Sequence, residues 1–205
     1  MYFVKTPSLL KPLAKDLLWH MPATEREVYF TFDDGPTLGV TEAALDLLKR
    51  YNAKATFFCL GKNVEAHPEL FSRMLSEGHA VGNHTYDHPE GWKTAQIAYL
   101  RNIIRAKKSI DSTLFRPPYG RITPAQVNAL KNRFRLVMWD VLSADFDTAN
   151  SPEKCYENVV NNVTPGSIVV FHDSVKARAN MLFSLERSLD HLSREGYIFR
   201  ALSDT

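Results

Sequence analysis

The chain has 205 residues, of which 44% are hydrophobic and 23% are charged. This is the composition of a globular protein, and it excludes intrinsic disorder, collagen-like repeats and low-complexity arrays. The 25 Lys and Arg residues nearly balance the 23 Asp and Glu residues, which leaves a formal net charge of +2. Because binding to phosphates needs concentrated positive charge, we expect no nucleic acid partner. A chain of this length folds without a structural metal, so we expect any bound metal to serve chemistry.

Residues 1–27 form an N-terminal segment that lacks the pattern of an export signal. Lysines, an aspartate and prolines interrupt its leucines, so no apolar core of about 7 to 15 residues remains. No part of the sequence approaches the roughly 18 consecutive apolar residues of a membrane span. We therefore expect a cytoplasmic protein with no membrane span, and nothing in the sequence indicates an obligate protein partner.

From Val28 onward, short segments with the composition of strands alternate with amphipathic segments of helical period. The predicted strands cover residues 28–32, 54–60, 79–83, 114–116, 134–139, 167–171 and 197–200. The predicted helices cover residues 41–51, 69–77, 94–110, 123–132, 151–163 and 181–195. Units of about 25 to 30 residues imply parallel strands joined by right-handed helical crossovers.

Residues 28–205 are therefore predicted to form a single α/β domain. Seven strands fit a distorted (β/α)7-type barrel, one unit short of eight, and a doubly wound open sheet is the alternative. In the helix predicted at 94–110, Ile97, Leu100 and Ile104 recur at helical spacing as its apolar series.

Reactive side chains gather where the predicted strands end. Asp33 and Asp34 follow the first strand, and His84 and His88 follow the third. The later strand ends carry Arg116, Asp140, Asp145, His172 and Asp173. The C-terminal ends of parallel strands meet on one side of a barrel or an open sheet, where active sites lie. We therefore expect one site built from five loops.

The pair of histidines His84 and His88 points to a metal ion. Two imidazoles four residues apart on a helical turn can face one ion, although local hydrogen bonds also explain such a pair. Two histidines, one aspartate and an open position form the pattern of a catalytic zinc or similar divalent site. Asp33 and Asp34 point in different directions, so one can bind the ion while the other takes a proton from water. The alternative for these two carboxylates is a solvated turn.

Two other strand ends allow more than one interpretation. His172 can be a third metal ligand, a general acid or a residue at the edge of the core. Arg116 can form an ordinary ion pair, while the proline-stiffened loop after it can present backbone amides as an oxyanion hole. The other histidines are expected at the surface, namely His20, His67, His79 and His191.

Five segments carry these residues in order: TFDDGP at 31–36, HTYDH at 84–88, RPPYG at 116–120, WDVLSADF at 139–146 and VVFHD at 169–173. Together they resemble the five motifs of the polysaccharide deacetylase family, the NodB-homology carbohydrate esterases of family 4. The resemblance runs from about Val28 to the end of the chain. It implies a distorted barrel of seven or eight β/α units. It also implies a metal-dependent hydrolase that removes acetyl groups from an N-acetylated sugar, oligosaccharide or polysaccharide, or less often O-acetyl groups.

The resemblance also implies which residues bind the metal. Asp34, His84 and His88 match the family's ligands for a divalent cation. Zinc is the first expectation, and cobalt or nickel is possible, because all three accept imidazole and carboxylate.

Further matches imply the catalytic roles. Asp33 corresponds to the general base, with Arg116 as the partner that orients it. His172 corresponds to the general acid, and Asp145 to the group that holds it. The backbone amide of Tyr119 would help to stabilise the oxyanion.

Leu142 and Phe146 depart from the family pattern, in which many members carry aspartate and tryptophan. Asp145 is retained, so we expect the reaction class to be kept while the wall of the sugar pocket is reshaped. Two alternatives remain open. One is a deacylase of a small amide, a ureide or a lipid-linked amino sugar on the same fold, and the other is a catalytically silent carbohydrate-binding protein.

Overall fold

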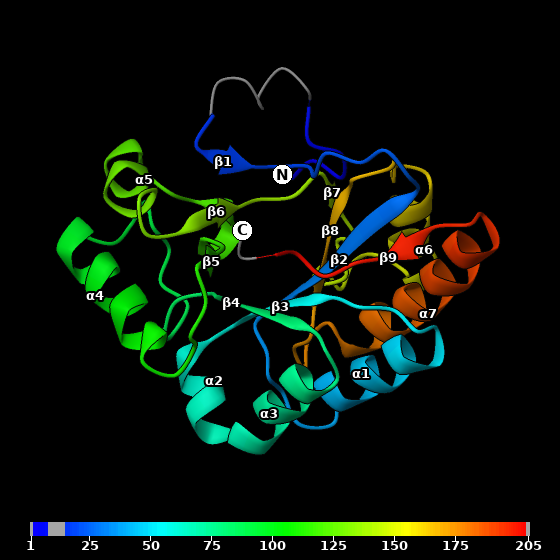
Figure 1. Cartoon of the computed structure of the whole chain (residues 1–205), viewed down its shortest axis with the longest axis horizontal. Helices are drawn as coiled ribbons and strands as arrows, with labels where there is room; N and C mark the ends of the chain where they lie inside the picture. The colour runs from blue at the N-terminus through cyan, green and yellow to red at the C-terminus, as the bar shows by residue number, and fades with distance from the viewer. Residues whose placement is uncertain (1, 8–14, 204–205) are drawn as a thin grey trace.

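The computed structural model describes residues 2–7 and 15–203, which form a curled sheet surrounded by helices (Figure 1). Its strands are β1 (Leu17–Leu18), β2 (Glu27–Asp33), β3 (Thr56–Cys59), β4 (Ala80–Asn83), β5 (Leu114–Phe115), β6 (Arg135–Val137), β7 (Val141–Leu142), β8 (Ile168–His172) and β9 (Ile198–Phe199). Its helices are α1 (Thr41–Arg50), α2 (Gly61–Ala66), α3 (Pro68–Ser76), α4 (Gln96–Lys107), the 3-10 turn η2 (Pro118–Gly120), α5 (Pro124–Leu130), α6 (Pro152–Val160) and α7 (Arg178–Arg194).

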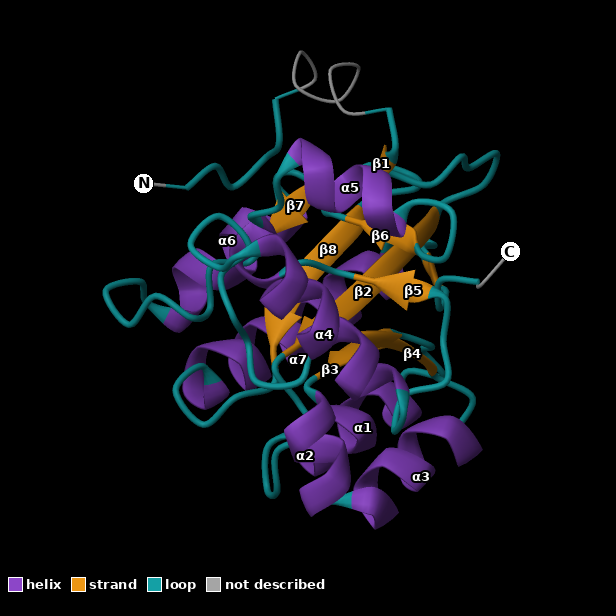
Figure 2. Cartoon of the chain, turned by 90° about the vertical axis from the view of Figure 1, so that its left-hand side faces the viewer, coloured by secondary structure: helices purple, strands orange, loops and turns teal. Residues whose placement is uncertain are grey.

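The strands follow the order β1-β6-β5-β4-β3-β2-β8-β7 along the sheet, and β9 pairs with the start of β2. All of these pairs are parallel, so the C-terminal ends of the strands share one side of the molecule. Residues 138–140 link β6 directly to β7, and the chain itself thus joins strands near the two edges of the curled sheet. Helices cover the outside of the sheet (Figure 2). The predicted distorted α/β barrel is confirmed.

The alternation of side chains along β2 determines which of them face the barrel interior. Phe30 and Phe32 point outward and pack in the apolar cluster that also contains residues of α1 and α7. Tyr29 and Thr31 point inward, where Tyr29 joins a second cluster and Thr31 contacts Arg116. The same period puts Asp33 on the inner face, at the C-terminal end of the strand.

Both described parts of the N-terminal segment pair with the sheet. Leu17 and Leu18 form β1 beside β6, and Lys5 forms an antiparallel bridge with Val141 of β7. These strands are only one or two residues long, so no alternating pattern in the sequence indicates them. The division of the chain into residues 1–27 and 28–205 stays a prediction.

Helix α4 turns a different face to the core from the one that its apolar series indicates. Ile97 and Ile104 are 67% and 44% exposed, whereas Tyr99, Ile103 and Ala106 are fully buried. Both sets recur at helical spacing, so periodicity alone does not choose between them. The buried series is the one that contains Tyr99, whose ring packs against Phe115 of β5.

The expectation that His79 lies at the surface is wrong. Its side chain is buried where the chain enters β4, and its Nδ1 accepts a hydrogen bond from the backbone N–H of Ala55 at 3.1 Å. Burial, together with the nearby charge of Lys54, lowers the pKa of His79 to about 4. The imidazole is therefore neutral and serves as a buried acceptor.

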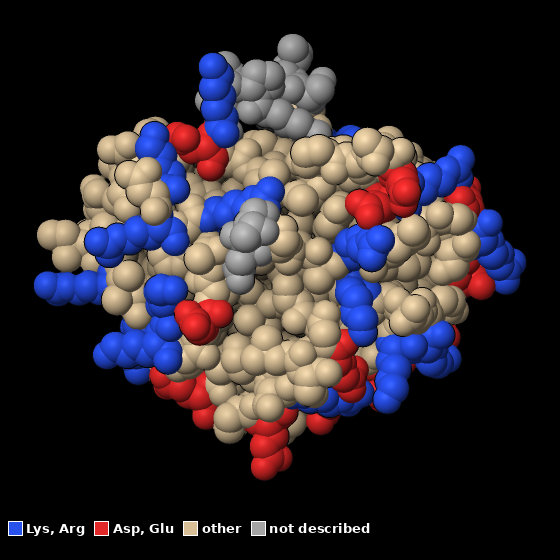
Figure 3. Space-filling view, in the orientation of Figure 1, with Lys and Arg blue, Asp and Glu red and all other residues tan. Residues whose placement is uncertain are grey.

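Lys and Arg side chains alternate with Asp and Glu around the rim of the face shown in Figure 3, as the small net charge suggests. Among the described residues, no helix is both long enough and apolar enough to cross a membrane.

Candidate active site

A cavity of about 620 Å³ opens at the C-terminal ends of the strands. It is lined by Tyr2, Asp33, Asp34, His84, His88, Tyr119, Arg121, Trp139, Leu142, Phe146, Val170, His172, Ser174 and Lys176. Six of the predicted site residues are among these, and the other two, Arg116 and Asp145, lie buried behind the wall in hydrogen bonds to Asp33 and His172. The structure therefore brings the eight residues with predicted roles to one place. Asp140, also expected at this site, does not line the cavity and instead binds Lys5 and Ser167.

Three potential metal ligands converge in this cavity. Asp34 Oδ1 lies 3.2 Å from His88 Nε2 and 3.8 Å from His84 Nε2. One ligand atom from each of the three residues lies within 4.8 Å of the other two. A carboxylate and two imidazoles at this separation fit a divalent cation with open positions for water or substrate.

The loops that carry the ligands adopt unusual backbone conformations. Asp34 and His88 have φ angles of 84° and 69°, in the left-handed region that few residues other than glycine adopt. Each loop is held by a side chain: Asn63 donates to the Asp34 carbonyl at 2.7 Å, and Thr85 Oγ1 accepts from the His88 N–H at 3.1 Å. Tertiary contacts thus hold a geometry that the local sequence does not favour.

The ring nitrogens of His84 have separate functions. Nδ1 lies 2.8 Å from the carbonyl oxygen of Arg116, and only a protonated Nδ1 makes that hydrogen bond. Nε2 faces Asp34. For His88, burial and the neighbouring His84 lower the pKa to about 4, against the opposite effect of Asp34. The His88 ring is therefore neutral and able to bind a cation.

Next to Asp34 in the chain, Asp33 forms a buried ion pair with Arg116. Arg116 Nη1 donates to Asp33 Oδ1 at 2.8 Å and to Thr31 Oγ1 at 2.7 Å, while Nη2 donates to the Met138 carbonyl at 2.8 Å. The guanidinium also lies 4.1 Å from the ring centre of Phe58. Burial raises the pKa of Asp33, but the charges of Arg116 and of the nearby histidines lower it more, so its net pKa lies below the usual value. This carboxylate is ionised at neutral pH.

At the end of the neighbouring strand, His172 forms an ion pair with Asp145. The Nδ1 atom of His172 lies 2.7 Å from Asp145 Oδ1, and its backbone N–H donates to Oδ2 at 2.8 Å. Burial lowers the pKa of His172, but the charge and the hydrogen bond of Asp145 outweigh it, so the pKa rises to about 9. This imidazole therefore holds a proton at neutral pH.

Tyr119 lies at the rim and has a φ angle of 59°. Its ring packs against that of His88, with 4.6 Å between the ring centres. Its backbone N–H donates to none of the residues that the structure describes. A free amide at the edge of the cavity is the donor that an oxyanion needs.

Two residues near the site have no role in the sequence interpretation. The buried Asp173 accepts a hydrogen bond from the Gly35 N–H at 3.0 Å and another from Thr41 Oγ1 at 2.5 Å, so it fixes the turn that carries Asp34. Its position after His172 at a strand end placed it among the side chains expected at the site, but gave it no specific role. Tyr2 lines the cavity from a distant part of the chain, and no local pattern indicates such a contact.

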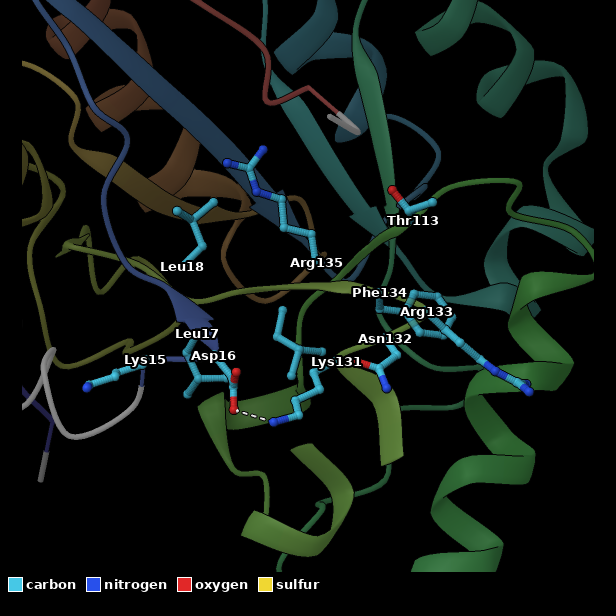
Figure 4. A pocket seen from close by; sticks show the side chains of 11 residues that line it. Lys15, Asp16, Leu17, Leu18, Thr113, Lys131, Asn132, Arg133, Phe134 and Arg135 are labelled. Carbon is cyan, nitrogen blue, oxygen red and sulfur yellow. Dashed lines mark hydrogen bonds and ion pairs between the residues drawn. The ribbon is translucent and has the colours of Figure 1, made fainter. Parts of the chain in front are cut away.

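A second cavity, of about 560 Å³, lies beside β1 and β6 (Figure 4). Its lining includes Lys15, Arg133 and Arg135, and an ion pair of 3.1 Å joins Lys131 to Asp16. None of the predicted catalytic or metal-binding residues lines it. The candidate chemistry is confined to the cavity at the strand ends.

A model of the polysaccharide deacetylase family matches residues 20–133 of the chain. A peptidoglycan-N-acetylglucosamine deacetylase of Bacillus cereus is 35% identical over 193 residues, which cover 91% of this chain and 91% of that protein. A second B. cereus protein of the same name is 39% identical over 160 residues, which cover 75% of this chain but only 58% of that protein.

A solved structure shows the same fold. The crystal structure of the Bc1960 peptidoglycan N-acetylglucosamine deacetylase, in complex with 4-naphthalen-1-yl-N-oxidanyl-benzamide, matches with a TM-score of 0.87 and 33% identity. The match covers 96% of this chain and 95% of the other. By sequence, by fold and by the five motifs gathered around one cavity, the chain belongs to the polysaccharide deacetylase family, the carbohydrate esterases of family 4.

Proposed function

We propose that this protein is a metal-dependent hydrolase that removes the acetyl group from an N-acetylated sugar of peptidoglycan. The observation that carries the proposal is the set of groups in one cavity: three potential metal ligands share it with an ionised carboxylate and a protonated imidazole. Hydrolysis of an acetamide needs these groups, because water must lose a proton and the amine must gain one.

The donor set fits a catalytic metal. His84 is oriented by a hydrogen bond from its second nitrogen, as histidine ligands usually are, and the three donors leave positions free. Zinc suits two imidazoles and a carboxylate, and cobalt or nickel accepts the same donors. A bound divalent cation would polarise the acetyl carbonyl and lower the pKa of water.

Asp33 acts as the general base in this proposal. Its carboxylate is ionised, lines the cavity and directly precedes the ligand Asp34 in the chain. Arg116 fixes Oδ1 of Asp33, so the second oxygen is free to accept a proton from the attacking water. General base catalysis of this kind contributes about 10²- to 10⁴-fold in rate.

His172 acts as the general acid. An amine leaves only after it gains a proton, and His172 is the group that holds one at neutral pH. Asp145 holds Nδ1, which leaves Nε2–H as the proton to be donated. The free N–H of Tyr119 donates to the oxygen that becomes negative during the attack.

The substrate class is proposed from the relatives, which are named for N-acetylglucosamine units of peptidoglycan. The wall of the cavity is consistent with a sugar: Trp139, Leu142, Phe146 and Val170 offer apolar surface beside the polar groups. The cytoplasmic location expected from the sequence stays a prediction. Fractionation of cells that produce the protein tests it, because a peptidoglycan deacetylase meets the mature polymer outside the cytoplasm.

The test is acetate release from N-acetylglucosamine oligosaccharides and from peptidoglycan fragments, with zinc-loaded protein. We expect release that stops when a chelator removes the metal, returns when zinc is restored, and is nearly absent in the Asp33→Asn variant. Equal release by this variant and by the parent protein, or no release from any acetylated amide or ester by metal-loaded protein, would disprove the proposal.

A further inference from the structure

Residues 2–6, here called the N-terminal strap, run beside β7 and pair with it at one antiparallel bridge. The backbone N–H of Leu142 donates to the Val4 carbonyl at 2.8 Å, and the N–H of Thr6 donates to the Asp140 carbonyl at 2.9 Å. Lys5 and Val141 form the antiparallel bridge between these bonds. The strap therefore extends the sheet next to the segment that carries Asp145.

Side chains anchor the strap to the barrel. Lys5 Nζ lies 2.6 Å from Asp140 Oδ2, which is fully buried, and 2.7 Å from the Asn162 carbonyl. Thr6 Oγ1 donates to the Trp139 carbonyl at 2.8 Å. A buried carboxylate that binds a lysine of the strap loses a partner when the strap detaches, and that loss is costly. The strap is thus a fixed part of the wall.

The strap carries Tyr2 to the cavity. The Tyr2 hydroxyl donates to Asp147 Oδ2 at 2.8 Å and accepts from Asn150 Nδ2 at 3.0 Å. The Tyr2 ring packs edge-on against Phe146 with 5.3 Å between centres, and Phe146 packs against His172 at 5.1 Å. Tyr2 is 39% exposed and lines the cavity, so part of its ring is available to a ligand.

The chemistry of the site indicates which part of a substrate lies there. This step rests on the proposed function, in which His172 gives its proton to the amine of the sugar. Atoms bonded to that amine belong to the sugar ring, and the acetyl group lies toward the metal ligands. Phe146 packs against His172, and Tyr2 packs against Phe146, so both rings lie beside the group that protonates the amine and face the sugar side of the substrate.

From this arrangement we infer that Tyr2 is a specificity-determining residue, which with Phe146 forms an aromatic subsite for the sugar ring next to the acetylated one. Tyrosine suits such a subsite, because its ring offers apolar surface to the C–H face of a pyranose while its hydroxyl stays hydrogen-bonded. The substrate it selects is an oligosaccharide rather than a monosaccharide. The subsite comes from a segment outside the five motifs.

The test compares acetate release from two substrates. One is a pentasaccharide of N-acetylglucosamine, and the other is the methyl glycoside of a single N-acetylglucosamine. We expect Tyr2→Ala to lower the ratio of the two kcat/KM values about tenfold, chiefly through KM for the pentasaccharide, because a ring contact is lost. Tyr2→Phe keeps the ring and should largely keep the ratio. Phe3→Ala is the matched control, since Phe3 is the next residue of the strap and is 61% exposed outside the cavity.

The result that overturns the inference is a ratio in Tyr2→Ala equal to that in Phe3→Ala, or an equal rise of KM for both substrates. Circular dichroism identifies a variant that is unfolded, and Tyr2→Leu then takes its place. If the parent protein releases no acetate, the proposed function fails. Calorimetric titration with the pentasaccharide still tests the subsite, because Tyr2→Ala should then weaken binding relative to Phe3→Ala, and equal binding overturns the inference.

Discussion

The ion pairs Asp33–Arg116 and His172–Asp145 are built alike, and in the proposed mechanism they have opposite roles. Asp33 and His172 end the neighbouring strands β2 and β8, and the register pairs these two residues directly. Each holds a fully buried partner of opposite charge, Arg116 on one side and Asp145 on the other. In both pairs the deeper residue sets the charge of the one that lines the cavity.

A buried partner of opposite charge can prepare one side chain to act as a base and another to act as an acid. Burial disfavours the charge on Asp33 and on His172 alike, and the buried partner overcomes that effect in each case. The pKa of Asp33 therefore falls and the pKa of His172 rises to about 9, so both side chains are charged at neutral pH. A carboxylate that is charged accepts a proton, and an imidazole that is charged donates one.

The largest expected effect on activity follows from replacing Asp33 or His172, the two residues proposed to transfer protons. Asp33→Asn and His172→Gln should each lower kcat/KM for an N-acetylated oligosaccharide by about 10²- to 10⁴-fold, because each removes one proton transfer. Acetate release measures the loss, and zinc content measured on the same samples is the control. Full activity in either variant with zinc bound would show that the two sides are not both needed.

Next is the loss of the buried partner on the base side. Arg116→Met leaves Asp33 buried without its cation, which should lower the free energy of unfolding by about 3 to 5 kcal/mol. Arg50→Met is the matched control, because Arg50 pairs with Glu186 at the surface and should change stability by about 1 kcal/mol at most. Urea unfolding compares the two. Similar values for both variants would mean that the buried pair does not support the fold.

A smaller effect concerns the acid side and the pH dependence of stability. The pKa of His172 is about 9 in the folded protein, above the usual histidine value of 6.5, so the folded state binds the proton more tightly. Its contribution is complete below pH 6.5 and is lost as the pH rises through 9, with an upper bound of about 3 kcal/mol. Urea unfolding of metal-free protein at these pH values should show the loss, and His172→Gln should flatten it. An equal loss in this variant would assign the effect to other groups.

The sequence predicts which residues gather at the cavity, because their positions follow a simple geometric rule. Asp33 and His172 stand at the ends of apolar segments, and parallel strands bring such ends together whatever the lengths of the connecting helices. The capping box that joins Thr123 to Gln126 at the start of α5 is likewise local, and the structure contains both of its hydrogen bonds.

Other features depend on contacts between distant residues, and the sequence gives no pattern for them. Tyr2 donates a hydrogen bond to Asp147, which is 145 positions away in the chain. The N-terminal strap that carries Tyr2 has no periodic pattern. The face that α4 buries is ambiguous, since Ile97 and Tyr99 both begin series at helical spacing. Histidine is a polar residue and is expected at the surface, but the buried His79 side chain accepts a hydrogen bond from the backbone N–H of Ala55.

The most direct test of the acid and base roles is an NMR titration of the His172 side chain in the metal-free protein and in an Asp145→Asn variant. We expect an imidazole that is protonated on both nitrogens at neutral pH, with a pKa of about 9, and a fall of that pKa when Asp145 loses its charge. A neutral His172 at pH 7 in the parent protein, or a pKa that Asp145→Asn leaves unchanged, would contradict the assignment of acid and base to the two ion pairs.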